Sequence, residues 1–201
     1  MYETAFNYVY GNSLLHRLDP RTKLGAVMCL SILIFREGSF AGMGLLIALE
    51  IVLSRFVSIS AWNIKIGFAF IPLVIAAIKL GPIKAGIVGA LADFLGAILF
   101  PIGPYFPGFT LTSFLNGVTF GVCLHKMHTS FSRILIAVAI KQFIFSLILN
   151  TLWISILYGT PYKALFITRI IQCIIIAPVE VITINLITRT ATTRIAKVNN
   201  R

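Results

Sequence analysis

Leu165 to Ile187 reads LFITRIIQCIIIAPVEVITINLI, an apolar run of 23 residues in which only Arg169 and Glu180 are charged. A helix needs about 20 mostly apolar residues to cross the hydrocarbon core of a bilayer. This stretch therefore predicts a transmembrane helix, and it sets the interpretation of the rest of the chain.

Further apolar segments precede it, and the whole 201-residue chain is 58% hydrophobic and 11% charged. An average soluble chain carries about 25% charged residues. We therefore expect an all-α fold, an integral membrane six-helix bundle with an extra N-terminal helix. The other predicted spans are Ala41 to Leu53, Ile66 to Leu80, Ile83 to Phe100, Phe109 to Leu124 and Ile134 to Leu157.

The formal net charge of +11 would indicate nucleic-acid binding in a soluble protein. Here the Lys and Arg residues cluster in loops between apolar runs, where lipid headgroups explain them, so no nucleic-acid partner is expected. Short cytoplasmic loops retain Lys and Arg, whereas translocated loops lose them. The cations at Lys79 and Lys84, at Lys126 and Arg133, and in the C-terminal tail predict a multi-pass protein of the cell membrane with both termini in the cytoplasm.

The first residues do not fit this pattern, because the apolar run Leu24 to Phe35 is too short to cross a bilayer. Asp19-Pro20 is a typical helix start, with Asp as N-cap and Pro at the first helical position. The sequence therefore predicts three parts: an N-terminal segment 1–38 in the cytoplasm or its membrane interface, a six-helix domain 39–190, and a basic cytoplasmic tail 191–201.

The sequence contains no recognisable catalytic signature. Gly81 to Gly86 has the glycine spacing of a phosphate-binding loop, but Ile87 and Val88 stand where Lys and Ser or Thr are required. The three cysteines fall inside apolar runs without paired spacing, which predicts neither disulfides nor a metal site. We expect no enzymatic activity and no bound cofactor.

Polar side chains recur at one depth within the predicted spans, on the order of 10 Å below the external surface at about 1.5 Å per helical residue. They are Glu50, Arg55, Asp93, Asn116, Asn150 and Arg169. One interpretation is internal pairing that only holds the bundle together, for example Glu50 with Arg169. The other is the polar lining of a ligand pocket, since ionisable groups inside a bilayer usually face a partner or a cavity.

Aromatic residues gather in the predicted loops and helix ends directly above this layer, as expected for the lining of a cofactor-sized pocket. They are Phe100, Tyr105, Phe106, Phe109, Trp153 and Tyr158. The stretch 100–110 also carries three prolines and two glycines, which predicts a stiff, shaped external loop. Lys141, Gln142 and Glu180 lie deeper, and we expect them to pair for structural reasons.

Small residues define two further surfaces. Gly117 and Gly121 have the spacing that lets helices approach closely in lipid, and packing inside the bundle is the favoured interpretation. Ala41, Gly44 and Ala48 form a second stripe, on the first predicted span, whose partner the residues alone leave open.

From about Gly44 to Arg189 the chain resembles the folate-specific substrate-binding subunit (S component) of energy-coupling factor (ECF) vitamin transporters. The resemblance rests on LLIALEIVLSRF (45–56), KIGF (65–68), ADFLGA (92–97), PIGPYFPGFTLT (101–112) and NTLW (150–153). The loop motif 101–112 is the most specific of these.

This resemblance implies a six-helix subunit that binds its vitamin at the extracellular side and delivers it by toppling within the membrane. The energy would come from a membrane coupling subunit (T component) and two cytoplasmic ATPases. The small residues of the first span, Ala41, Gly44 and Ala48, would meet the coupling subunit.

A folate ligand combines a pterin ring, which needs stacking and hydrogen-bond pairs, with a glutamate tail that carries two carboxylates. The resemblance therefore implies that Phe106, Phe109 and Trp153 sandwich the rings and that Asp93 or Asn150 reads the amino-oxo edge. Arg55, Lys65 or Arg169 would hold the tail. Phe68, Phe100, Tyr105 and Tyr158 complete the predicted substrate-binding set.

The segment 11–24, GNSLLHRLDPRTKL, instead resembles the beginning of the T component itself, so the chain is expected to join a T-component start to an S component. Two other functions stay open. One is an S component for another vitamin, such as riboflavin or thiamine, and the other is a stand-alone secondary transporter, for which inverted repeats and broken helices would be expected.

Overall fold

The structure is a computed structural model that describes residues 40–56, 58–61, 64–101, 103–125 and 130–199. The N-terminal segment 1–38, with its expected extra helix, lies outside these residues. The described elements are α3 (Phe40–Arg55), β1 (Ile59–Ala61), β2 (Ile64–Ile66), α4 (Phe70–Leu80), α5 (Pro82–Leu99), α6 (Pro107–Leu124), α7 (Phe131–Ala139), the π-helical η1 (Ile140–Leu149), α8 (Asn150–Tyr158) and α9 (Tyr162–Asn199).

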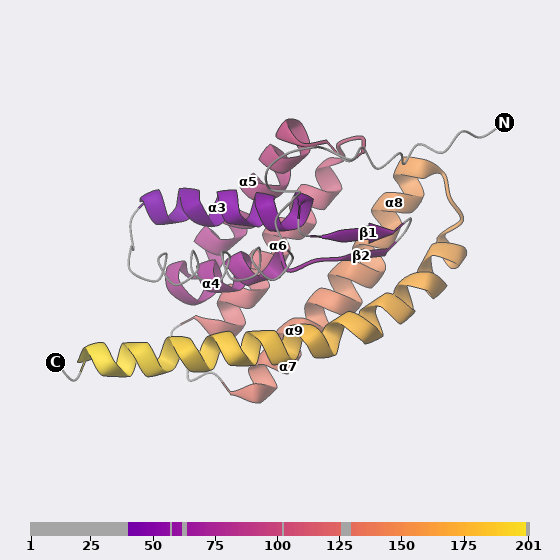
Figure 1. The fold of residues 1–201 in the computed structure, drawn as a ribbon. Helices are drawn as coiled ribbons and strands as arrows, with labels where there is room; N and C mark the ends of the chain where they lie inside the picture. Colours follow the sequence, from indigo (N-terminus) through magenta and orange to yellow (C-terminus); the bar gives the residue numbers. More distant parts are fainter. Residues whose placement is uncertain (1–39, 57, 62–63, 102, 126–129, 200–201) are drawn as a thin grey trace.

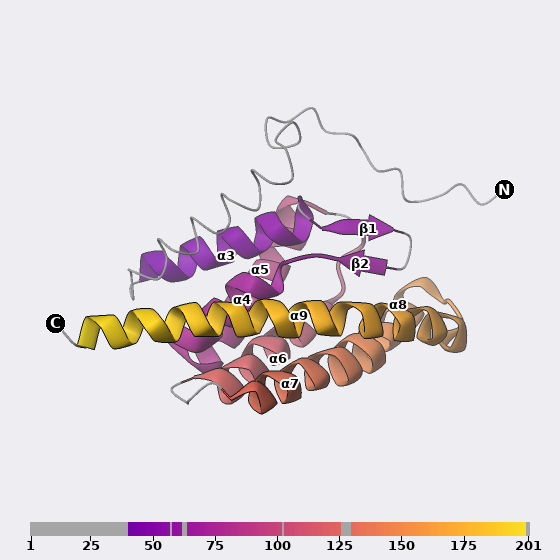
Figure 2. The same ribbon diagram turned by 60° about the horizontal axis from the view of Figure 1, so that its bottom comes forward.

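Each apolar segment predicted as a span contains a long helical stretch, which confirms the helical membrane fold. The fifth span is one continuous helical rod, α7–η1–α8, and α9 runs past the predicted end of the sixth span (Figures 1 and 2). In the described part, Pro82–Leu99, Phe131–Tyr158 and Tyr162–Arg189 are long and apolar enough by themselves to cross a membrane. The exposed isoleucines of α9, such as Ile182 at 69% exposure, fit a surface that contacts lipid.

The predicted start of the second span is wrong. Ile66 belongs to strand β2, which pairs antiparallel with β1 through Ile59 opposite Ile66 and Ala61 opposite Ile64. β-branched residues favour strands. Gly67 lets the returning chain pass close to the segment between α3 and β1, because a Cβ there would lie 2.8 Å from Ser58 Cβ. The hairpin projects at the same end of the molecule as α8 (Figure 2).

The centre of the fifth span also differs from an ordinary α-helix. Ile140–Leu149 forms a π-helix, a rare conformation that is frequent at functional sites. The rod ends at Gly159, whose φ of +63° is the left-handed conformation that commonly closes a helix. The chain then turns back into α9.

The polar residues that were expected to pair inside the bundle do so. Lys141 on η1 forms an ion pair with Glu180 on α9, and Gln142 Nε2 donates to the other carboxylate oxygen of Glu180 at 3.0 Å. The apolar core beside them is centred on α4, where Val74, Ala76 and Ala77 are fully buried. These contacts join α4, the rod and α9 into one body.

Glycines allow α5 and α6 to pack in close contact. A Cβ on Gly117 would overlap the backbone of Ala85, and one on Gly121 would overlap Pro82. From the other side, a Cβ on Gly89 would lie 2.7 Å from the carbonyl oxygen of Ser113. The predicted role of Gly117 and Gly121 in packing within the bundle is thereby confirmed.

We expect Gly121→Val to lower the stability of the purified protein by about 1–3 kcal/mol, because the added side chain must push α6 away from Pro82. The change is measured as a fall of several degrees in the apparent Tm in detergent. Gly44→Val is the matched control, since a Cβ at Gly44 meets nothing within 4 Å. Equal Tm values for the two variants would contradict the packing role.

Candidate functional site

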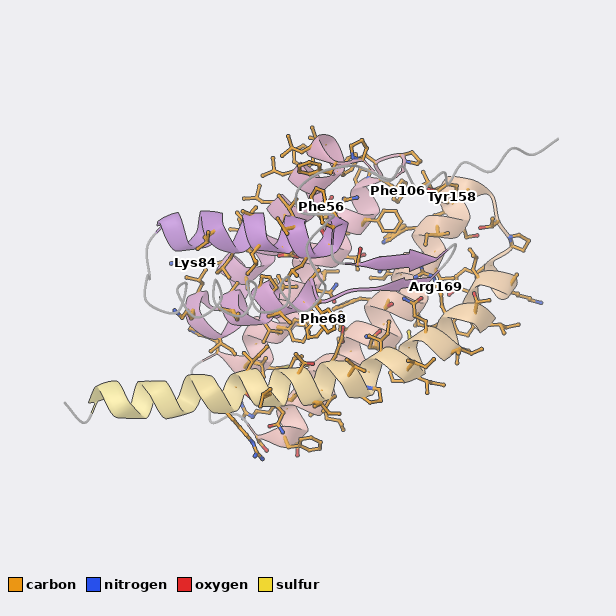
Figure 3. All side chains as sticks on the ribbon, in the orientation of Figure 1. Phe56, Phe68, Lys84, Phe106, Tyr158 and Arg169 are labelled. Atoms are coloured by element: carbon orange, nitrogen blue, oxygen red, sulfur yellow. The ribbon has the colours of Figure 1, made fainter. Side chains whose placement is uncertain are left out.

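A cavity of about 730 Å³ opens among the helices at the end of the molecule that carries the hairpin and the α5–α6 loop. This volume lies within the usual range of about 300–1,000 Å³ for small-molecule sites. Figure 3 places Phe106 and Tyr158 at this end and Lys84 at the opposite end. Residues of α3, α5, α6, the rod and α9 line the cavity.

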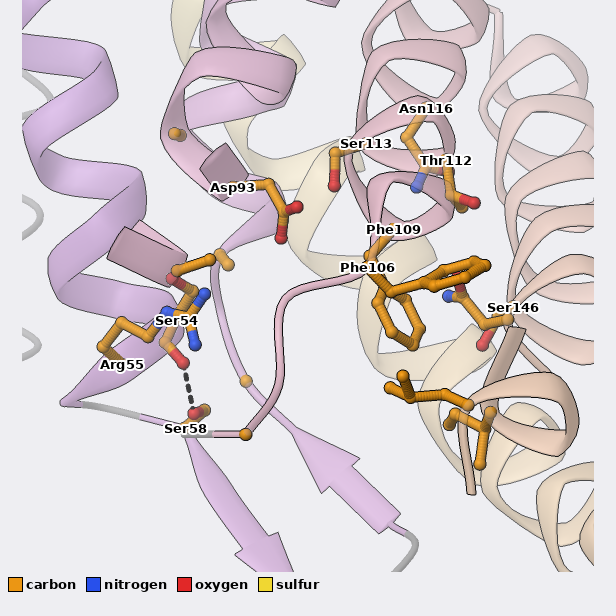
Figure 4. Close-up of a pocket in the computed structure, with 18 of the residues that line it drawn as sticks. Ser54, Arg55, Ser58, Asp93, Phe106, Phe109, Thr112, Ser113, Asn116 and Ser146 are labelled. Carbon is orange, nitrogen blue, oxygen red and sulfur yellow. Dashed lines mark hydrogen bonds between the residues drawn. The ribbon is translucent and has the colours of Figure 1, made fainter. Parts of the chain in front are cut away.

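The polar layer predicted from the sequence converges on this one cavity. All six of its members line the wall: Glu50, Arg55, Asp93, Asn116, Asn150 and Arg169. They come from α3, α5, α6, α8 and α9, where Arg55 stands at the end of its helix and the other five stand between one and three turns inside theirs. Figure 4 draws Arg55 and Asp93 on one side of the Phe106 and Phe109 rings and Ser146 on the other.

Several residues that line the cavity, most of them from the polar layer, carry buried polar atoms without a hydrogen-bond partner in the described part of the chain. They are Glu50 Oε2, Arg55 Nε, Asn116 Oδ1, Asn150 Oδ1, Thr160 Oγ1 and Arg169 Nε, all on residues that line the cavity. Leaving a buried polar atom unpaired costs about 1–3 kcal/mol, and more for a charged group. The cavity is therefore equipped for a polar ligand.

The suggested ion pair between Glu50 and Arg169 is not formed. Arg169 Nη1 instead donates to the backbone carbonyl of Ser146 at 3.2 Å. Glu50 Oε2 has no hydrogen-bond partner among the residues that the structure describes. The deeper Lys141 also lines the cavity, but its charge is already balanced by Glu180.

An aromatic cluster forms one wall. The Phe106 ring contacts Phe109 edge-on at 6.1 Å between centroids and Trp153 at 5.6 Å. Trp153 lies behind the wall, where Nε1 donates to Thr112 Oγ1 at 3.1 Å. Gly108 leaves room for both rings, because a Cβ there would lie 2.6 Å from each.

The α5–α6 loop is tied to α5 by a chain of hydroxyl contacts. Thr110 Oγ1 donates to Asp93 Oδ2 at 2.8 Å, and the Tyr105 hydroxyl lies 3.2 Å from Thr110 Oγ1. The Tyr105 ring also packs edge-on against Phe94 at 5.6 Å. Asp93 therefore anchors the loop that covers the cavity.

The remaining predicted site residues lie in different places. Phe68 packs on the core beside Phe70, and Phe100 is exposed and packs against Phe56, so neither lines the cavity. Lys65 sits in strand β2 opposite Ser60. The side chains of Lys65 and Ala41 lie outside the described part of the structure, whereas Gly44 and Ala48 are exposed on α3.

Small hydroxyl residues of the cavity were not singled out from the sequence. They are Ser54, Ser58, Thr112, Ser113, Ser146 and Thr160. Ser54 and Ser58 bond to local backbone carbonyls, as Ser58 Oγ does to Ser54 at 2.6 Å (Figure 4). Helical spacing could have identified Thr112 and Ser113, because both share a helix face with Phe109 and Asn116, which were predicted to line the site.

Comparison with known proteins agrees with this architecture. A family model described as ECF transporter, substrate-specific component, matches residues 39–188. The chain is 45% identical over 142 residues to the folate transporter FolT of Clostridium novyi, covering 71% of this chain and 83% of that protein. It is 30% identical over 148 residues to FolT of Leuconostoc mesenteroides, covering 71% of this chain and 80% of that protein.

A solved structure is also similar. The crystal structure of FolT bound with folic acid matches with a TM-score of 0.72 and 37% identity, covering 75% of this chain and 92% of that chain. The family model spans well over half of the sequence. The chain therefore belongs to the family of ECF transporter substrate-specific components.

Proposed function

We propose that this protein is the folate-binding S component of an ECF-type transporter, which captures the vitamin at the extracellular side for ATP-driven uptake. The observation that carries the proposal is the cavity, which joins an aromatic wall to two half-buried arginines whose buried Nε atoms have no hydrogen-bond partner in the described part of the chain. Its similarity to FolT bound with folic acid supports the same ligand.

Folate fits the chemistry of this lining. The glutamate tail carries two carboxylates, and Arg55 and Arg169 both line the cavity, each with a buried Nε that has no hydrogen-bond partner among the described residues. Arginine forms strong charge-assisted bonds with carboxylates, often through two parallel N–H donors. We assign the tail to these arginines, with Lys65 of strand β2 as a third candidate cation.

The ring system would pack on the aromatic wall of Phe106 and Phe109, which Trp153 supports from behind. Asn150 and Asp93 are candidates for its amino-oxo edge. Tyr105 and Tyr158 would close the external side, because both line the cavity near its mouth. Phe68 and Phe100 would act on the site only through the residues they pack against.

Transport would require a T component and two cytoplasmic ATPase subunits. The exposed face of α3 at Gly44 and Ala48 is our candidate surface for the T component, joined by Ala41.

We further propose that both termini are cytoplasmic. Residues 39–190 would form the binding domain, 1–38 would be a T-component-like addition, and 191–201 would be a basic tail. Lys84 lies at the end opposite the cavity, as this orientation requires (Figure 3).

Uptake of labelled folate by cells with and without the coupling subunits tests the proposal as a whole. We expect uptake only with the complete set, and high-affinity binding by the purified protein alone. Equally fast uptake without the coupling subunits would refute the ATP-driven mechanism. Absence of folate binding by the purified protein would refute the ligand.

Arg169→Ala is expected to weaken folate binding by about 10- to 100-fold. The reason is that the variant loses a charge-assisted hydrogen bond, which contributes about 1.5–3 kcal/mol to binding. Isothermal titration calorimetry measures the change. Pteroate, which lacks the glutamate tail, should bind the parent and the variant equally. Arg189→Ala, an exposed arginine on the same helix, is the matched control. An unchanged folate Kd for Arg169→Ala would remove this residue from the tail site.

Thr110→Val is expected to speed folate dissociation about tenfold, because it removes the hydroxyl that links Tyr105 to Asp93 while keeping the side-chain shape. Thr110→Ser, which retains the hydroxyl, should dissociate at the parent rate. Stopped-flow fluorescence with excess unlabelled ligand measures the rate. If the Val variant releases folate as slowly as the Ser variant, the loop contact does not control exit.

Gly44→Val should leave folate affinity unchanged and reduce uptake at least tenfold, because the added side chain protrudes from an exposed face of α3. Both quantities are measured on the same preparation, by calorimetry and by uptake into proteoliposomes containing the coupling subunits. Full uptake by the variant would exclude this face as the T-component surface.

A further inference from the structure

Glu50 is a buried acidic residue that the assignments above do not use. Its side chain is only 8% exposed, lines the cavity from α3, and carries Oε2 without a hydrogen-bond partner. A buried carboxyl group in an apolar bundle is costly unless a donor reaches it. The unpaired oxygen therefore indicates that a ligand donates a hydrogen bond to this carboxyl group.

The other charged groups that line the cavity are engaged elsewhere or are cationic. Asp93 Oδ2 accepts from Thr110, Lys141 pairs with Glu180, and Arg169 donates to the carbonyl of Ser146. In the described part of the chain, none of them forms an ion pair with Glu50. Glu50 thus differs from Asp93, the other acidic side chain of this cavity, because neither of its oxygens accepts a hydrogen bond from the described residues and one of them is fully buried.

Depth separates Glu50 from the arginine of its own helix. Arg55 ends α3, and Glu50 stands five residues earlier, about 7.5 Å deeper at 1.5 Å per residue. Phe70 and Leu73 of α4 line the same cavity and add apolar surface. A carboxylate tail would be repelled by Glu50 and attracted by Arg55 and Arg169, so an anionic ligand would bind with its ring, and not its tail, beside Glu50.

We propose that Glu50 is a specificity-determining residue that accepts hydrogen bonds from the donor edge of the pterin ring, formed by the 2-amino group and the adjacent ring N3–H. This assignment rests on the proposed function. The two oxygens of a carboxylate match two parallel N–H donors, the geometry seen in arginine–carboxylate pairs. Asn150 then remains the candidate for the carbonyl side of the ring, and Glu50 takes the place of Asp93 at the amino side, because Asp93 Oδ2 already accepts from Thr110.

The test combines a variant with a modified ligand. Folate and an analogue in which a methyl group replaces the 2-amino group are titrated into the parent protein and into Glu50→Gln. The parent should prefer folate at least tenfold, and the preference should fall to threefold or less in the variant. Leu45→Gln places the same amide on an exposed position of the same helix and should keep the full preference.

Each outcome decides the assignment. A parent that binds folate and the analogue equally overturns it without any variant, so a failure of Glu50→Gln to fold does not block the test. A folded Glu50→Gln protein that keeps the parent's preference overturns it too, while the proposed function stands. If the parent binds neither ligand, the proposed function fails and the assignment with it.

Discussion

Inside a bilayer a polar side chain has no solvent to bond with, so its partner must come from the protein or from a ligand. This constraint divides the buried polar residues of the described chain into two groups. Lys141, Gln142 and Glu180 satisfy one another between η1 and α9. The members of the polar layer instead line one cavity, and five of the six carry a buried polar atom that has no partner among the described residues, while the outer faces of α5 and α9 stay apolar enough for lipid.

The cavity can exist because its surroundings are tightly packed. Gly117 and Gly121 bring α6 against α5 closely enough that no side chain fits between them. The same helix then presents Phe109, Thr112 and Asn116 to the cavity. Trp153 fixes the aromatic wall from the rod through its hydrogen bond to Thr112. A rigid wall of this kind holds its polar groups in place before any ligand arrives, which lowers the cost of binding.

Helical spans and the converging polar layer could be predicted from the sequence, because hydrophobic length and depth along a helix are local properties. The contacts that each side chain makes could not be predicted in the same way. The suggested pairing of Glu50 with Arg169 and the placing of Phe100 in the pocket required knowing how helices rotate against each other. The strand at Ile66 was missed because its apolar residues continue directly into α4, and only the pairing with β1 distinguishes them.

A ligand in this cavity would act as a structural element of the bundle. Glu50 stands on α3, in the half of the chain that precedes the rod, whereas Arg169 stands on α9. A molecule that engages both ends connects the two halves through groups that otherwise lack partners. Ligand binding and folding are then linked, and a ligand at 100 times its Kd adds about 2.7 kcal/mol to stability. The empty protein keeps its unpartnered polar atoms, so the same atoms that make it less stable without ligand give it affinity.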